Sequence, residues 1–267
     1  MPVYITSCYD SKMSKKVLIS ISLGITLLIL LCLFFVYEQP VEAPSPKETN
    51  PLPITNSSVK TPETFDKTKY SLTDSTSIWA VVNKKRPLPK GFIPTDLTVP
   101  NVALRLAPSA EQMKIRLIAQ TDLMDMFSSA KNEAVNLVFG SGFRSESYQK
   151  QLYEQYSSQS GQAQADTFSA RPGYSEHQSG LAFDATAGSG KCPLEICFET
   201  TPEGIWIMNN AYRYGFVIRY QKGKEPITGY RYEPWHLRYV GKELASELNK
   251  TGQTLEEFFG LENATQY

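Results

Sequence analysis

The segment from Val17 to Tyr37 constrains this chain more than any other feature, because it runs without a single charged residue. Roughly 20 apolar residues in a helix span the hydrocarbon core of a bilayer. A buried core helix is the alternative, but such a helix is rarely apolar on every face. We therefore expect residues 17–37 to form a transmembrane signal-anchor.

The charges around this segment predict its orientation. Lys12, Lys15 and Lys16 precede it, so the positive-inside rule places residues 1–16 in the cytoplasm and the rest of the chain outside the cell. A cleaved signal peptide is the competing interpretation, but its apolar core is usually only about 7–15 residues long. Pro44 also follows the one sequence that resembles a cleavage site. The expected location is the cell membrane, with a single span.

Residues 38–74 are rich in Pro, Thr, Ser and charge, and poor in large apolar side chains. Such a segment buries too little surface to offset chain entropy, so we expect a disordered linker. In polyproline form it would reach on the order of 100 Å. Residues 75–267 then form one folded domain that works at a distance from the membrane.

The overall charge argues against nucleic acid as a partner. Lys plus Arg number 27 and Asp plus Glu number 27, so the formal net charge is zero. No basic cluster is interleaved with aromatic residues either.

Periodicity and end signals within residues 75–267 predict an α+β domain with a central antiparallel sheet flanked by helices. Ser109, Ser145 and Thr201 are the expected helix N-caps, and Thr254 with Glu257 has the spacing of a capping box. The expected helices cover 109–132, 145–158, 201–215, 241–252 and 254–261, and the expected strands cover a short stretch after 77, 135–143, 180–187, 216–220 and 230–240.

Two cysteines lie in the exported domain, Cys192 and Cys197. An oxidising exterior allows them to form a disulfide, which is the pairing we expect. A metal-binding pair and two free thiols are the alternatives. The spacing is loose for a metal site, and no further Cys or His lies nearby in the sequence.

The whole chain contains only two histidines, His177 and His236. Asp184 follows the first of them in an apolar run, where a charge is costly to bury. Glu233 precedes the second by three residues, which places the two on opposite faces of a regular strand. Pro234 breaks that regularity, so we infer a bulge or strand end that lets both side chains face one cleft.

These four side chains suit zinc chemistry. Two neutral imidazoles and a carboxylate, with an open fourth position, form a catalytic zinc site, and His177, Asp184 and His236 can supply it. Glu233 is then free to act as the general base and acid. Two ordinary histidines, one at a turn and one on a half-buried strand, are the alternative.

Three motifs in order resemble the VanY-type zinc D-alanyl-D-alanine carboxypeptidases, within the group that includes lysostaphin-like endopeptidases and the hedgehog N-terminal domain. They are "SGFRSESYQ", "SEHQSGLAFD" and "EPWH". The resemblance implies zinc ligands at His177, Asp184 and His236, and a catalytic acid and base at Glu233. It also implies substrate contacts from Arg144, Gln149, Ser175 and Tyr220.

The resemblance further implies removal of the terminal D-alanine from the stem peptide of peptidoglycan. A guanidinium such as Arg144 can hold a terminal carboxylate with two hydrogen bonds, although a surface ion pair is the commoner role of arginine. Tyr220 can equally be a core aromatic, and we expect Trp235 to pack against the site. An L,D-carboxypeptidase acting on tetrapeptide stems, an endopeptidase and a non-catalytic zinc-stabilised wall-binding module are the rival functions.

Overall fold

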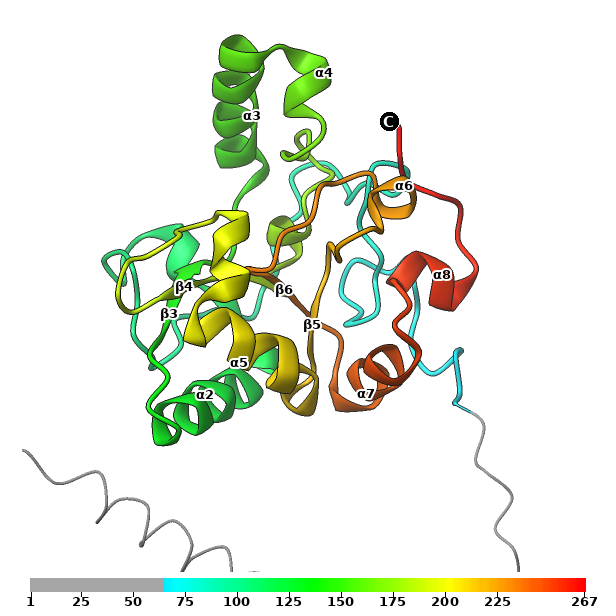
Figure 1. The fold of residues 1–267 in the computed structure, drawn as a ribbon. Coiled ribbons are helices and arrows are strands. Elements are labelled where there is room, and N and C mark those ends of the chain that lie inside the picture. The colour runs from blue at the N-terminus through cyan, green and yellow to red at the C-terminus, as the bar shows by residue number, and fades with distance from the viewer. Residues whose placement is uncertain (1–64) are drawn as a thin grey trace, which may run out of the picture. The chain divides into compact units, whose positions relative to one another are not determined.

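A four-stranded antiparallel sheet forms the centre of the computed structural model, which describes residues 65–267 (Figure 1). The strand order is β3-β4-β6-β5, so the two middle strands are far apart in the sequence. Helices surround the sheet, as the α+β expectation requires. The strands are β3 (Leu137–Ser141), β4 (Ala182–Ala187), β5 (Phe216–Ile218) and β6 (His236–Tyr239).

One face of the sheet carries the main hydrophobic core. On β4, Phe183 and Ala185 point to this face, where they pack with residues of α2 (Leu117–Asn132) and α5 (Pro202–Asn210). Because side chains alternate along a strand, Asp184 points to the opposite face. The sheet thus separates an apolar side from a side that carries polar groups.

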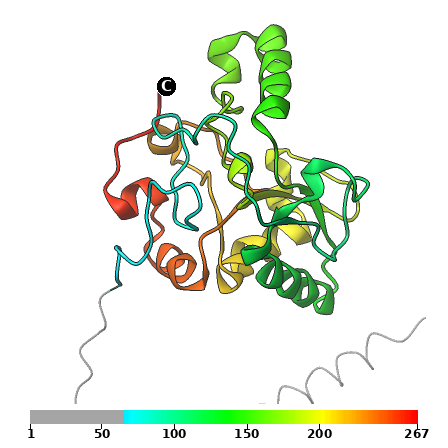
Figure 2. The same cartoon turned by 180° about the vertical axis from the view of Figure 1, so that it is seen from behind.

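A second core joins the beginning and the end of the described chain. Trp79 and Val81 pack with residues of α7 (Lys242–Thr251) and α8 (Leu255–Phe259). Figure 2 shows this N-terminal segment crossing the back of the domain. The ring of Phe65 also lies 5.5 Å from that of Trp79, so residues 65–74, which we assigned to the linker, include a side chain packed on the domain.

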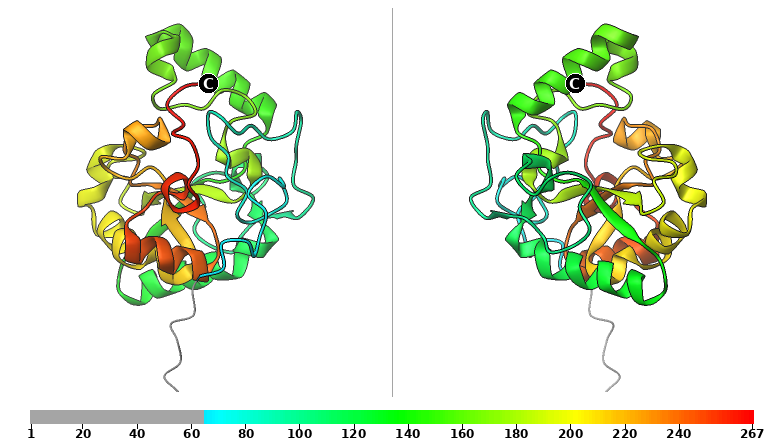
Figure 3. Two further views of the ribbon diagram at one scale, coloured as in Figure 1. Left: turned by 90° about the vertical axis from the view of Figure 1, so that its right-hand side faces the viewer. Right: turned by 90° about the vertical axis from the view of Figure 1, so that its left-hand side faces the viewer.

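Two helices project from the domain, α3 (Glu146–Ser160) and the short α4 (Gln162–Ala165) (Figure 3). Gln149 is the one buried residue of α3. A helix that buries so little along most of its length stands away from the hydrophobic core. The remaining elements are α6 (Glu225–Thr228), a small sheet of β1 (Leu97–Thr98) with β2 (Ile115–Arg116), and short 3-10 helices at Glu111–Met113, Glu176–Ser179, Ile196–Thr200 and Ala211–Tyr214.

The predicted helix ends are mostly confirmed. Ser145 accepts a hydrogen bond from the backbone of Tyr148, and Thr201 accepts one from Gly204, each as the N-cap of its helix. The capping box of Thr254 and Glu257 forms at the start of α8. Local hydrogen bonding therefore sets where these helices begin.

The helix that we predicted from Ser109 begins later, at Leu117. Glu111–Met113 form a 3-10 turn, and Ile115–Arg116 pair with β1 as a strand. Ile115 is fully buried in this pairing. Tertiary packing of Ile115 thus outweighs the helical preference of the surrounding sequence.

The strand predicted after residue 77 does not form. The carbonyls of Ile78 and Ala80 accept hydrogen bonds from the Arg238 side chain, and the indole of Trp79 donates to the carbonyl of Val240. Hydrogen bonds from the Arg238 side chain satisfy these two backbone carbonyls, so the segment needs no partner strand. The last predicted strand is also shorter than expected, because it begins only at His236.

The Cys192–Cys197 disulfide is present, as predicted. Within residues 65–267, no helix is long and apolar enough to cross a membrane. The predicted span at residues 17–37, the cytoplasmic segment before it and most of the predicted linker lie outside the described residues.

Candidate functional site

The three predicted zinc ligands meet on the polar face of the sheet. His177 lies in a 3-10 turn that Gly180 ends with a φ of 67°, a left-handed conformation that favours glycine. Asp184 and His236 are direct cross-strand partners on β4 and β6, so their side chains point the same way. The ligand atoms of the three residues lie within 4.8 Å of one another.

The geometry of these atoms fits a zinc ion. Asp184 Oδ1 lies 3.4 Å from His177 Nε2 and 3.4 Å from His236 Nδ1. The other ring nitrogen of His177, Nδ1, lies 2.7 Å from the carbonyl of Gly142 and can donate to it. Nε2 is then left with its lone pair and has no hydrogen-bond partner among residues 65–267. Two nitrogens and one oxygen converge, which is a zinc donor set with the fourth position open.

The two histidines differ in their electrostatic surroundings. Burial, followed by the nearby Arg144 charge, lowers the pKa of His177 to about 4. Burial also lowers the pKa of His236, but the nearby carboxylates of Asp184 and Glu176 outweigh it and raise that pKa to about 9. Zinc requires neutral imidazole, so protons and zinc compete for the two histidines.

Glu233 lies next to the three proposed zinc ligands. Its Oε2 is 3.7 Å from His236 Nδ1, and its backbone carbonyl accepts a hydrogen bond from the His236 amide at 3.2 Å. This turn is the strand end that we inferred from Pro234. Burial, with Asp184 as the main additional cause, raises the pKa of Glu233 to about 7. A carboxyl group with that pKa can accept and return a proton near neutral pH.

All eight predicted site residues line one cavity of about 130 Å³. Arg144 enters it from the end of β3, where its amide donates to the carbonyl of His177 at 3.2 Å. Its Nε atom is buried and has no hydrogen-bond partner in the described part of the chain. A larger cavity of about 280 Å³ between α5, β5 and α7 contains none of the eight residues, so it is not the site of this chemistry.

The other predicted contacts form the walls of the cavity. Gln149 is buried and donates from Nε2 to the carbonyl of Ala170 at 2.8 Å. Ser175 is also buried, directly before the turn that carries His177. Tyr220 has its ring 4.8 Å from that of His236, so it is at once a packed aromatic and a cavity residue. Trp235 lines the cavity as well.

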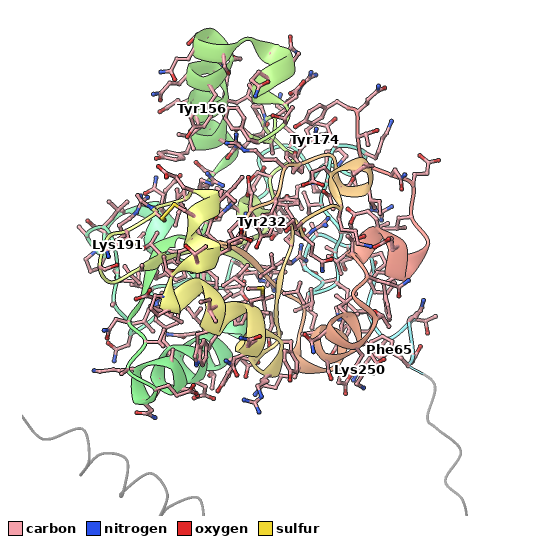
Figure 4. The ribbon with its side chains drawn as sticks, viewed as in Figure 1. Phe65, Tyr156, Tyr174, Lys191, Tyr232 and Lys250 are labelled. Carbon is pink, nitrogen blue, oxygen red and sulfur yellow. A yellow bond between two sulfur atoms is a disulfide. The ribbon has the colours of Figure 1, made fainter. Side chains whose placement is uncertain are left out.

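The sequence interpretation missed several residues around the site. Glu176 lies beside His236, and on β6 the polar His236 and Arg238 alternate with Leu237 and Tyr239. That alternation was a usable signal, because it places Arg238 on the same face as His236. Two other cavity residues, Leu194 and Tyr156, carry no signal in the sequence; Figure 4 shows Tyr156 on α3.

The disulfide encloses Leu194, one wall of the cavity, in a short loop (near Lys191 in Figure 4). Replacing both Cys192 and Cys197 with serine should lower the free energy of unfolding by about 2 kcal/mol, from the entropy of closing so short a loop. It should also raise KM by freeing Leu194. Chemical denaturation and steady-state kinetics check both effects, with Ile196→Ala, an exposed change in the same loop, as the control. An unchanged KM would contradict a role for this loop in the cavity wall.

The chain is similar to known peptidases in sequence and in structure. Residues 112–242 match the model of the family VanY, described as D-alanyl-D-alanine carboxypeptidase. The protein named "Putative carboxypeptidase YodJ" of Bacillus subtilis (strain 168) is 44% identical over 183 residues. The match covers 68% of this chain and 67% of YodJ.

Two solved structures are similar in fold and sequence. The LD-carboxypeptidase LdcB is 41% identical with a TM-score of 0.67, and the match covers 72% of this chain and 89% of that one. The D,D-pentapeptidase VanY from a VanB-type resistance cassette, solved with Zn(II), is 31% identical with a TM-score of 0.55. That match covers 67% of this chain and 96% of the other.

Proposed function

Because the chain belongs to the VanY family of zinc D-alanyl-D-alanine carboxypeptidases, we propose that it removes the terminal D-alanine from peptidoglycan stem peptides. The observation that carries the proposal is the convergence of His177, Asp184 and His236 beside Glu233 in one cavity. These are a zinc donor set and a carboxyl group that can exchange protons near neutral pH.

In this proposal His177, Asp184 and His236 hold the zinc. When bound, the zinc supplies a Lewis acid that makes water a better nucleophile and stabilises negative charge on the carbonyl oxygen. Glu233 takes the proton from the attacking water and later gives it to the departing amine of D-alanine. Burial keeps Glu233 out of bulk water, so its proton is exchanged with the reactants.

We propose that Arg144 holds the terminal carboxylate of the substrate. Its buried Nε without a partner supports this role, because an unsatisfied guanidinium nitrogen beside the metal ligands is costly unless a ligand pairs with it. Gln149, Ser175 and Tyr220 line the same cavity and are the proposed further contacts. A requirement for a free terminal carboxylate disfavours an endopeptidase.

Replacing Arg144 with alanine should lower kcat/KM by about 10- to 100-fold on peptides with a free C-terminus, the effect of losing charged hydrogen bonds of about 1.5–3 kcal/mol. Peptides with an amidated C-terminus should be poor substrates of both proteins, with little difference between them. Kinetics on a matched pair of free and amidated peptides checks this. Equal losses on both peptides would contradict the carboxylate contact.

The dependence of activity on pH should follow Glu233. Burial raises its pKa to about 7, and only the ionised form can accept a proton. Activity should therefore fall as pH decreases through this pKa, and the positive charge of zinc moves the midpoint to or below about 7. A profile of kcat against pH checks it, and activity that stays constant down to pH 4 would contradict the assignment.

A second candidate function is L,D-carboxypeptidase activity on tetrapeptide stems. It is favoured by the higher identity to LdcB, at 41%, than to the D,D-enzyme VanY, at 31%. Mass spectrometry of pentapeptide and tetrapeptide stems separates the two. A D,D-enzyme shortens the pentapeptide by one alanine and leaves the tetrapeptide intact, whereas an L,D-enzyme shortens the tetrapeptide. No loss of alanine from either peptide would contradict both and leave a non-catalytic module.

We also propose that the domain acts outside the cell, anchored through residues 17–37. Support comes from the uncharged segment with its preceding lysines and from the disulfide, a bond typical of oxidising compartments. Protease added to intact cells without their wall should digest the catalytic domain; a domain protected until the cells are lysed would contradict this location.

A further inference from the structure

Four charged side chains are buried beneath the proposed zinc site. Glu176, Arg219, Arg238 and Glu256 have side chains no more than 1% exposed. Glu176 Oε1 accepts hydrogen bonds from Arg219 Nε at 2.9 Å and Arg238 Nη1 at 2.8 Å. Arg219 also forms a two-pronged ion pair with Glu256, at 2.9 and 2.6 Å. The two positive and two negative charges sum to zero.

The second oxygen of Glu176 faces a zinc ligand. Glu176 Oε2 lies 3.5 Å from His236 Nε2, and neither atom has a hydrogen-bond partner elsewhere in residues 65–267. The opposite ring nitrogen, His236 Nδ1, faces Asp184. If Nε2 carries the proton and points it at Glu176, the lone pair of Nδ1 is directed into the site.

We propose that Glu176 is a positioning residue that holds His236 in the tautomer and orientation that bind zinc through Nδ1. A carboxylate behind a metal-bound histidine fixes its ring in this way and makes the imidazole a better ligand. The inference rests on the proposed zinc site but not on the identity of the peptide that is cut.

The two arginines are what make Glu176 a fixed partner. They hold Oε1 from two directions, so the carboxylate cannot rotate away from His236. Arg238 is itself fixed, because β6 places it two residues after His236 on the same face and its Nη2 donates to the carbonyl of Ala80 at 2.7 Å. The orientation of Glu176, and through it that of His236, is thus set by two arginines that do not line the cavity.

Stability alone is a weak explanation for this cluster. Taking ions out of water is expensive, and replacing a buried ion pair with apolar side chains is often neutral or stabilising. The outer end of the cluster does connect elements, because Asn83 Nδ2 donates to Glu256 Oε1 at 2.9 Å and so links the N-terminal segment to α8. A change at Glu256 therefore tests the structural role of the cluster, and a change at Glu176 tests the positioning of His236.

Glu176→Gln tests the proposal with a change of few atoms. The amide oxygen must stay with Arg219 and Arg238, which only donate, so the amide nitrogen then faces His236 Nε2. Two donors cannot pair, and the ring responds by moving its proton to Nδ1, the proposed ligand atom. We expect zinc affinity to fall about 10- to 100-fold.

Glu256→Gln is the matched control, because it makes the same change in the same cluster without touching His236. We expect it to lower stability and leave zinc affinity within about three-fold of wild type. The measurement is competition for zinc against a chromophoric chelator, using the full-length chain in detergent. The visible spectrum of the cobalt-substituted proteins gives a second readout, in which only Glu176→Gln should differ from wild type.

Equal losses of zinc affinity in the two variants, or wild-type affinity in Glu176→Gln, would overturn the proposal. If Glu176→Gln does not fold, Glu176→Asp replaces it. The shorter side chain keeps its charge for the two arginines but moves the carboxylate away from His236, so we expect weaker zinc binding. Unchanged zinc affinity in Glu176→Asp would also overturn the proposal. Zinc affinity is measured without peptide, so an absent peptidase activity is distinguishable from failure of this inference.

Discussion

Glu233→Gln is expected to lower kcat by roughly 10²- to 10⁴-fold while the protein still binds zinc. The amide keeps the shape of the side chain but cannot take a proton from water. The neighbouring His236 stays in place, because Asp184 and Glu176 face the two nitrogens of its ring. Kinetics on a stem peptide, together with metal analysis, measures the two properties separately.

Glu262→Gln is a suitable control for that experiment, because this glutamate is exposed and lies outside the cavity. It should leave both kcat and zinc content unchanged. Retention of full activity in Glu233→Gln would remove Glu233 from the mechanism. Loss of zinc in the same variant would instead make Glu233 a ligand, which would contradict its proposed role as acid and base.

Asp184→Asn is expected to weaken zinc binding by more than roughly 100-fold. Removing a residue that only hydrogen-bonds to a metal ligand lowers the affinity by no more than about that factor. Asp184 is the anionic member of the donor set and lies 3.4 Å from both histidine ligands, so a neutral amide removes the charge that attracts the cation. Activity at limiting zinc should disappear with it.

Thermal unfolding offers a check that is independent of activity. Zinc at 100 times its Kd stabilises a protein by about 2.7 kcal/mol, so wild type should melt at a higher temperature when zinc is added. Asp184→Asn should show little shift at the same zinc concentration, and Asp125→Asn, an exposed change on α2, should behave as wild type. A full zinc-induced shift in Asp184→Asn would show that this carboxylate is not a ligand.

The site was predictable from the sequence because its chemistry is concentrated in short motifs. His177 and His236 are the only histidines, and Asp184 is a charge in an apolar strand. Alternation along β4 and β6 then brings Asp184 and His236 to one face once the two strands pair in register. The N-caps at Ser145 and Thr201 were equally readable, because they depend on local hydrogen bonds.

Features that depend on long-range contacts were not predictable in the same way. Glu176 and Glu256 are far apart in the sequence, and only the fold joins them through Arg219. The late start of α2 has the same origin, because Ile115 pairs with a strand that precedes it by many residues. A single sequence records which residues are polar or apolar, but it does not record which distant residues they meet.

We expect His177 Nε2, Asp184 Oδ1 and His236 Nδ1 to bind one zinc ion with an open position towards Glu233. Anomalous diffraction at the zinc absorption edge, from crystals of the zinc-loaded protein, locates the ion. One strong peak should lie roughly 2.0–2.2 Å from each of the three atoms. A peak at another site, or coordination through His236 Nε2 in place of Nδ1, would contradict it.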